Sequence, residues 1–137
     1  MAPLEGKIIP IFSLDENGWP HPALLSYYEI VARNSSSLDM ALWRDSSTAN
    51  NLRRDGKITL MITDKDINFY IKGRVQELQY EMAGAPQVSR LRMTVEELLE
   101  DQEANAQITS GMTYVRQKER GANDFAAKVL RILREGL

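Results

Sequence analysis

Three consecutive hydroxyl side chains, Ser46, Ser47 and Thr48, stand where an apolar segment gives way to a short helical pattern that ends at Gly56. A hydroxyl at a helix start can cap the helix by accepting a hydrogen bond from a backbone N–H of the first turn. The same hydroxyls, with free N–H groups at the positive end of the helix dipole, can instead bind a phosphate. The segment therefore has two interpretations, a structural cap and a phosphate site.

Few other residues could carry out chemistry. His21 is the only histidine and stands between Pro20 and Pro22 with no base or second ligand beside it, so we interpret it as a turn or surface residue. The absence of cysteine excludes disulfides, thiolate catalysis and cysteine metal sites. The acidic residues at 96–101 fit the exposed face of a helix. We predict no metal site and name no catalytic residue, so a bound cofactor would have to supply any demanding reaction.

Composition narrows the possible partners. The chain has 137 residues, with 17 Lys and Arg against 19 Asp and Glu and no dominant basic block, so a nucleic-acid partner is not expected. Glu5, Lys7 and Asp15 interrupt the start too early for a signal peptide, and no run of about 18 apolar residues could span a membrane. We therefore expect a single domain over residues 1–137, cytoplasmic and with no membrane partner.

Period-two alternation of apolar residues predicts a mainly β chain. A turn at Glu16–Gly18 predicts a first hairpin, and Leu91, Met93 and Val95 are expected to face the core. The predicted strands cover residues 7–13, 23–32, 38–42, 57–63, 67–75 and 88–95, with a short last strand at 113–115. Six or seven strands predict a barrel or a sandwich.

Three helices are expected between and after these strands. The first is the short helix that follows the hydroxyl-rich turn. Capping-box spacing at Thr94–Glu97 predicts a second over EELLEDQEANA, residues 96–106. A third follows Asn123 and Asp124, where an apolar stripe has helical spacing and is expected to cover one end of the barrel. The stripe consists of Phe125, Val129, Ile132 and Leu133, with Lys128, Arg131 and Arg134 facing outward.

Five short segments follow one another in a characteristic order over roughly residues 7–115: Gly18–Pro22, Ala23–Ser26, Met40–Trp43, Ser46–Leu52 and Ile71–Val75. In order and spacing they resemble the pyridoxamine 5'-phosphate oxidase-like flavoproteins. The resemblance implies a mainly β (α+β) fold that binds FMN. The fold that the resemblance implies is a six- to seven-stranded antiparallel split β-barrel with short helices and a C-terminal helix.

The resemblance also implies where the flavin would bind. The ring would lie near the backbone of the strand matching Ala23–Tyr27, and the phosphate near the hydroxyl-rich turn, with Trp43 and Tyr27 or Tyr28 bordering the pocket. The cofactor-binding residues implied are Leu25, Ser26, Tyr27, Leu42, Trp43, Arg44, Ser46, Ser47, Thr48 and Asn51. It further implies a homodimer with two flavin sites across the subunit interface. More aromatic and methionine residues than a small barrel obviously buries also favour a dimer, among them Trp19, Tyr27, Tyr28, Met40 and Trp43.

The chain departs from the vitamin-pathway oxidases of this family at the phosphate. Those oxidases carry Ser-Arg-Lys in the turn and a lysine on the preceding strand, where this chain has Ser46, Ser47, Thr48 and Ser26. Because charge-assisted hydrogen bonds are roughly twice as strong as neutral ones, FMN should bind more weakly. This weakening is not expected if Arg44, Arg53 or Arg54 also contacts the phosphate.

Two hypotheses about function stay open. The substrate-binding tail of the oxidases is unmatched, which argues against pyridoxal phosphate synthesis, and Arg74, Arg90 and Arg92 are interpreted as solvated or interface side chains. The first hypothesis is a small FMN-dependent oxidoreductase with an unknown substrate, for which a deazaflavin is the alternative cofactor. The second is a non-catalytic flavin-binding or ligand-free dimeric barrel. Haem, used by some members, has little support from a lone His21.

Overall fold

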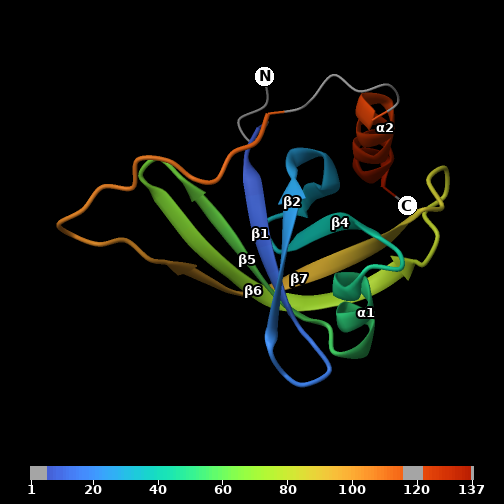
Figure 1. Ribbon diagram of the computed structural model, residues 1–137, viewed down its shortest axis with the longest axis horizontal. Helices are drawn as coiled ribbons and strands as arrows, with labels where there is room; N and C mark the ends of the chain where they lie inside the picture. Colours follow the sequence, from blue (N-terminus) through green and yellow to red (C-terminus); the bar gives the residue numbers. More distant parts are fainter. Residues whose placement is uncertain (1–5, 116–121, 137) are drawn as a thin grey trace.

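The computed structural model describes residues 6–115 and 122–136 as one curled antiparallel sheet with two α-helices (Figure 1). The elements are β1 (Ile8–Leu14), β2 (Pro20–Ser26), the 3-10 turn η1 (Tyr27–Glu29), β3 (Ile30–Asn34), β4 (Ser37–Trp43), α1 (Ser47–Arg54), β5 (Lys57–Asp64), β6 (Ile67–Gln79), β7 (Val88–Glu100) and α2 (Ala122–Glu135). The predicted mainly β fold, with a short helix and a C-terminal helix, is confirmed.

The seven strands form a single sheet in the order β2-β1-β5-β6-β7-β4-β3, and every neighbouring pair is antiparallel. Strands β6 and β7, thirteen residues each, are the longest, and the sheet curls so that β1 and β2 cross in front of β7 in Figure 1. Inward-facing side chains from five strands fill the enclosed core. Its fully buried members are Ile11, Met40, Leu60, Leu91 and Met93 from the strands and Ala49 from α1. The predicted inward positions on β7 are thus confirmed for Leu91 and Met93.

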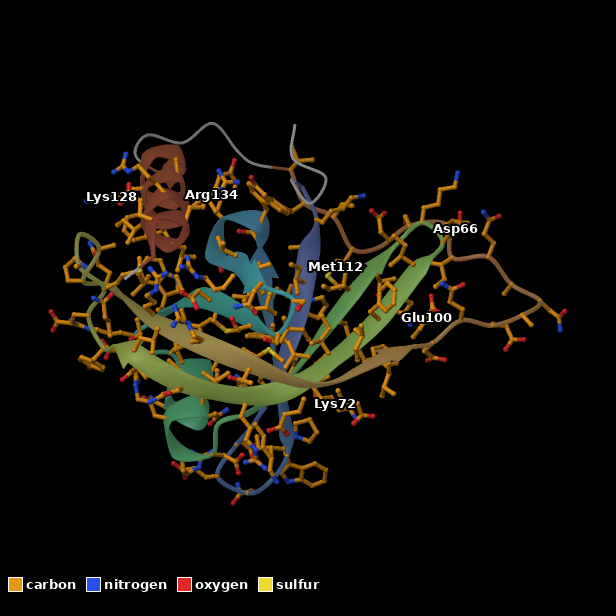
Figure 2. All side chains as sticks on the ribbon, turned by 180° about the vertical axis from the view of Figure 1, so that it is seen from behind. Asp66, Lys72, Glu100, Met112, Lys128 and Arg134 are labelled. Carbon is orange, nitrogen blue, oxygen red and sulfur yellow. The ribbon has the colours of Figure 1, made fainter. Side chains whose placement is uncertain are left out.

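Helix α2 packs on η1, β3 and β4, where it closes a second, smaller core. Val129 and Leu133 from its apolar stripe are buried there against Ala41 of β4, as the spacing predicted. Lys128 and Arg134 are exposed on the same helix (Figure 2). Strand β4 is therefore covered on both faces, which explains its run of four buried residues from Asp39 to Leu42.

Two strand predictions need correction. The predicted strand 23–32 is interrupted after Ser26, whose Oγ accepts a hydrogen bond from the Tyr28 N–H at 3.3 Å and caps η1. The chain changes direction there and continues as β3. At 113–115 the structure shows an isolated bridge between Lys7 and Thr113 instead of a strand.

The predicted helix over 96–106 is wrong, because β7 continues to Glu100. Its last residues pair with β6 through Lys72↔Glu97 and Phe69↔Glu100. Capping-box spacing is a local signal, and backbone hydrogen bonding to the long neighbouring strand β6 outweighs it. Within the described ranges, neither helix is long and apolar enough to span a bilayer.

Candidate functional site

The three hydroxyls of the turn after β4 have different surroundings. Ser46 is the N-cap of α1, and its Oγ accepts a hydrogen bond from the Ala49 N–H at 3.1 Å. Thr48 is buried, whereas Ser47 is exposed. The helix ends as expected, with Gly56 at a φ of 83° just after the last turn. The capping interpretation is confirmed for Ser46, and a phosphate contact by this segment stays a prediction.

An open polar pocket of about 310 Å³ lies between the start of α1 and the β1–β2 turn. Two of the predicted cofactor-binding residues, Ser47 and Asn51, line this polar pocket. Its complete lining is Asp15, Glu16, Asn17, His21, Ser47, Asn50, Asn51 and Arg54. Hydroxyl, amide and guanidinium groups thus line this pocket beside the carboxyl groups of Asp15 and Glu16. The first N–H groups of α1 have no backbone acceptor within the helix, and Ser46 caps that of Ala49.

Arg54 is held in place at the polar pocket. Its Nη2 donates to the carbonyl of Leu14 at 2.6 Å and to Oδ1 of Asn51 at 3.2 Å. Asn51 is itself buried, and its Nδ2 donates to Ser13 Oγ at 3.1 Å, which ties α1 to β1. The Asp15 carboxylate of the lining also has partners within the chain, because its Oδ1 accepts hydrogen bonds from the backbone N–H groups of Asn17 and Trp19.

This donor set fits a phosphate less well than a turn with three cations, because Asp15 and Glu16 also bring two carboxyl groups to the lining. Of the three arginines considered for the role, Arg44 forms ion pairs with Asp45 at 3.3 Å and Glu81 at 3.1 Å. Arg53 forms an ion pair with Glu77 at 2.6 Å. Both charges are thus largely neutralised by carboxylates. Arg54 forms no ion pair within the described residues and lines the polar pocket, so it is the cation best placed for an anion.

A second, smaller pocket of about 170 Å³ lies where α2 meets η1 and β4. Trp43 stacks on Phe125 of α2, with ring centroids 5.5 Å apart and an angle of 5° between the ring planes. Trp43 is nevertheless 60% exposed to solvent. The lining of this aromatic pocket is Tyr28, Glu29, Ala41, Trp43, Val88, Phe125, Ala126 and Val129. Trp43 and Tyr28 therefore border one pocket, while a flavin contact by either residue stays a prediction.

The remaining predicted residues lie outside both pockets. Leu25 and Leu42 are buried in the main core. Ser26 caps η1 and donates through Oγ to Glu29 Oε1 at 2.8 Å. Tyr27 contacts Arg134 of α2 through its hydroxyl and its ring. Arg44 lies beside Tyr80, with its guanidinium 5.7 Å from the ring centroid. The predicted set is thus divided among the core, the polar pocket, the aromatic pocket and positions outside all three.

Comparison with known proteins links this geometry to a fold. No family model matches the chain. The uncharacterized protein YclD of Bacillus subtilis (strain 168) is 29% identical over 100 residues, which cover 73% of this chain and 65% of YclD. The match therefore spans slightly less than two thirds of that relative.

Three solved structures share the architecture. An F420 reductase superposes with a TM-score of 0.59 at 9% identity, over 70% of this chain and 91% of its own. A protein from Clostridium acetobutylicum related to general stress protein 26, of the pyridoxinephosphate oxidase family, gives 0.54 at 16% identity, over 69% and 84%. HutZ, the heme storage protein from Vibrio cholerae, gives 0.56 at 12% identity, over 70% and 87%. The chain has the split-barrel fold of the pyridoxamine 5'-phosphate oxidase-like proteins. At these identities the likeness establishes the fold alone.

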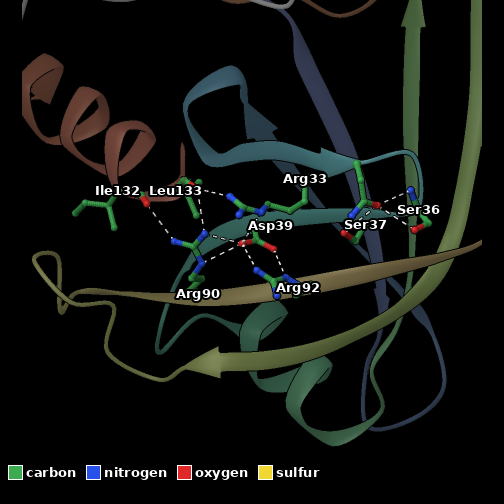
Figure 3. Close-up of polar contacts among 9 residues, drawn as sticks. Arg33, Ser36, Ser37, Asp39, Arg90, Arg92, Ile132 and Leu133 are labelled. Carbon is green, nitrogen blue, oxygen red and sulfur yellow. Dashed lines mark hydrogen bonds and ion pairs between the residues drawn. The ribbon is translucent and has the colours of Figure 1, made fainter. Parts of the chain in front are cut away.

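The split barrel also contains a buried charge cluster that the sequence did not reveal (Figure 3). Asp39 and Arg90 are fully buried, with Asp39 Oδ2 accepting from Arg90 Nη2 at 2.6 Å. Arg92 Nε donates to Asp39 Oδ1 at 2.7 Å. Arg90 further donates to the carbonyls of Ile132 and Leu133 at 3.1 and 3.0 Å. The interpretation of Arg90 as a solvated or interface residue is therefore wrong, because it fastens the carbonyl end of α2 to the sheet.

Two carboxylates of the split barrel have shifted pKa values in opposite directions. Burial alone would raise the pKa of Asp39, but hydrogen bonds from Arg92 and Arg90 outweigh burial and lower it. Burial raises the pKa of Glu29, and the hydrogen bonds from Ser26 only partly offset it. Nothing in the local sequence around Glu29 indicates this environment. Within residues 6–115 and 122–136, no three His, Asp or Glu side chains lie close enough to hold a metal ion.

Proposed function

We propose that this split-barrel protein binds FMN and is a small flavin-dependent oxidoreductase. The observation that carries the proposal is the polar pocket at the start of α1, where Arg54 and Ser47 offer donors to a phosphate. It lies at the turn where the family resemblance expects the phosphate of the flavin. The F420 reductase among the structural neighbours makes a deazaflavin the second cofactor to test.

The residues of this chain would bind and orient the cofactor. Arg54, the Ser47 hydroxyl and the first N–H groups of α1 would hold the phosphate, and Asn51 would keep α1 fixed against β1. When bound, FMN would supply the electron or hydride transfer that the side chains cannot carry out unaided. The electron donor we favour is a nicotinamide or another small donor. Pyridoxamine phosphate is not favoured, because the substrate-binding tail of the oxidases is unmatched.

We also propose that the protein is a cytoplasmic homodimer. An apolar row crosses the outer face of five neighbouring strands. It consists of Leu24 on β2, Pro10 on β1, Met61 on β5, Tyr70 on β6 and Leu99 on β7. Pro10 pairs with Leu24, and Tyr70 pairs with Met61 on one side and with Leu99 on the other. Leu24 is 55% exposed and Leu99 37%, and the other three are partly exposed. An exposed apolar row on a sheet face is typical of a subunit interface. Of the residues that suggested a dimer, Met40 lies in the core and lends no support.

A non-catalytic or ligand-free barrel is the second candidate. The observation that favours it is that several expected flavin contacts already have partners within the chain. Ser46 caps α1, Thr48 is buried, and Trp43 is stacked on Phe125. A barrel that keeps its shape without flavin would need these contacts.

Reconstitution with FMN separates the two candidates. After loading, flavin reduction by NADH or NADPH is followed at its visible absorption band without oxygen, beside a pyridoxamine phosphate turnover assay in air. Reduction by a nicotinamide without pyridoxal phosphate formation supports the proposal. Efficient pyridoxal phosphate formation would contradict the proposed substrate range. FMN binding without either activity would favour the non-catalytic candidate.

A further inference from the structure

The aromatic pocket has an unusual composition for so small a space. Three of its lining residues, Tyr28, Trp43 and Phe125, are aromatic, and Glu29 is the one charged residue among the eight. The remaining four are small or aliphatic. The pocket is built from four elements, η1, β4, β7 and α2, and α2 contributes Phe125, Ala126 and Val129. Its chemistry is thus a single negative charge in an aromatic and apolar lining.

Glu29 has no cation to balance its charge within the described residues. Its Oε1 accepts from the neutral Ser26 hydroxyl at 2.8 Å, and it takes part in no ion pair there. Arg134 of α2, which reaches η1, contacts Tyr27 instead. A carboxylate that is partly removed from water without a counter-charge is stabilised when a cation arrives. The raised pKa of Glu29 has the same physical origin.

The aromatic lining selects the kind of cation. Ring faces are electronegative and attract ammonium groups, while the rings also bury apolar substituents. A metal ion would need several oxygen ligands, and this lining has one carboxylate. Pockets for drug-sized ligands occupy about 300–1,000 Å³, so a pocket of about 170 Å³ suits a smaller molecule.

We propose that the aromatic pocket binds a small organic ammonium ion, with its charged group at Glu29 and its apolar part among Tyr28, Trp43 and Phe125. The site does not depend on flavin, and it is separate from the polar pocket, with which it shares no residue. An anion is disfavoured by Glu29. A neutral apolar molecule would gain only the contacts with the rings.

The test compares three probes of one shape that differ in charge: benzylammonium, benzyl alcohol and benzoate. Each is titrated by calorimetry into the full chain without FMN, so that failure here is distinct from failure of flavin binding. We expect benzylammonium to bind at least tenfold more tightly than benzyl alcohol, and benzoate not to bind. Equal affinities for benzylammonium and benzyl alcohol, or no binding of benzylammonium, would overturn the proposal.

A variant tests the role of the charge directly. Glu29→Gln keeps the size of the side chain and an acceptor for Ser26, so benzylammonium should bind at least tenfold more weakly while benzyl alcohol is unaffected. Glu103→Gln, at an exposed position after β7, is the matched control and should change neither affinity. Unchanged benzylammonium affinity in a folded Glu29→Gln protein would overturn the proposal. If that variant does not fold, the comparison of probes on the unaltered chain decides.

Discussion

Arg90 on β7 bonds at the same time to the carboxylate of Asp39 on β4, at 2.6 Å, and to the last carbonyls of α2, at 3.0 and 3.1 Å. One buried guanidinium thereby joins the sheet to the helix that supplies Phe125 to the aromatic pocket. Asp39 and Arg90 are 51 residues apart in the sequence. The position of α2, and with it the geometry of that pocket, therefore depends on a long-range contact in the protein interior.

Replacing Asp39 should be strongly destabilising. Asp39→Asn leaves the fully buried Arg90 without its counter-charge, and breaking a buried pair in this way costs about 3–5 kcal/mol. Urea unfolding of the two proteins at pH 7 measures the difference. Glu96→Gln, which removes the exposed partner of Arg74, is the control and should cost less than about 1 kcal/mol. Similar losses in both variants would contradict the buried pair.

Glu29 should make the protein less stable at neutral pH than in mild acid. Its pKa is raised in the folded state, so its contribution is most favourable below the unfolded value, about 4.3, and is lost as pH rises through the folded value. Glu29→Gln should therefore raise the melting temperature at pH 7, and the gain should vanish near pH 4. A gain that is independent of pH would show that the charge is not the cause.

Ser46 and Ser47 should separate the two roles of the turn. Ser46→Ala removes the cap of α1 and should lower the free energy of unfolding by about 1 kcal/mol. Ser47→Ala changes an exposed hydroxyl, so stability should hold within about 0.5 kcal/mol while FMN affinity falls. Thermal melts and FMN titrations of both variants make the comparison. Unchanged FMN affinity in Ser47→Ala would leave the turn with a structural role only.

Charging the outer apolar row should dissociate the proposed dimer. Met61→Lys places a cation at the centre of the row, beside Tyr70, and should yield a monomer in light scattering at micromolar concentration. Leu98→Lys is the control, since Leu98 is 60% exposed and lies outside the row. A monomeric unaltered protein under the same conditions would refute the dimer.

The sequence predicted what depends on neighbours along the chain and missed what depends on register. Alternation in β5 correctly placed Ile58 and Leu60 in the core, because the pattern within one strand is enough to show which of its side chains face inward. The pairing of Asp39 with Arg90 could not be predicted, because it requires the registration of β4 on β7. The local capping signal at 94–97 failed for the same reason, since it does not include the residues of β6 with which this segment pairs, such as Lys72 opposite Glu97.

Titration of FMN and riboflavin into the unaltered protein and into Arg54→Gln, followed by quenching of flavin fluorescence, tests the proposed phosphate site most directly. The two flavins differ only in the phosphate. We expect saturable FMN binding that is tighter than riboflavin binding. Loss of the charge-assisted hydrogen bonds of Arg54, about 1.5–3 kcal/mol, should weaken FMN roughly tenfold or more and leave riboflavin unchanged. Equal affinity of the unaltered protein for the two flavins, or no binding of FMN, would contradict the account.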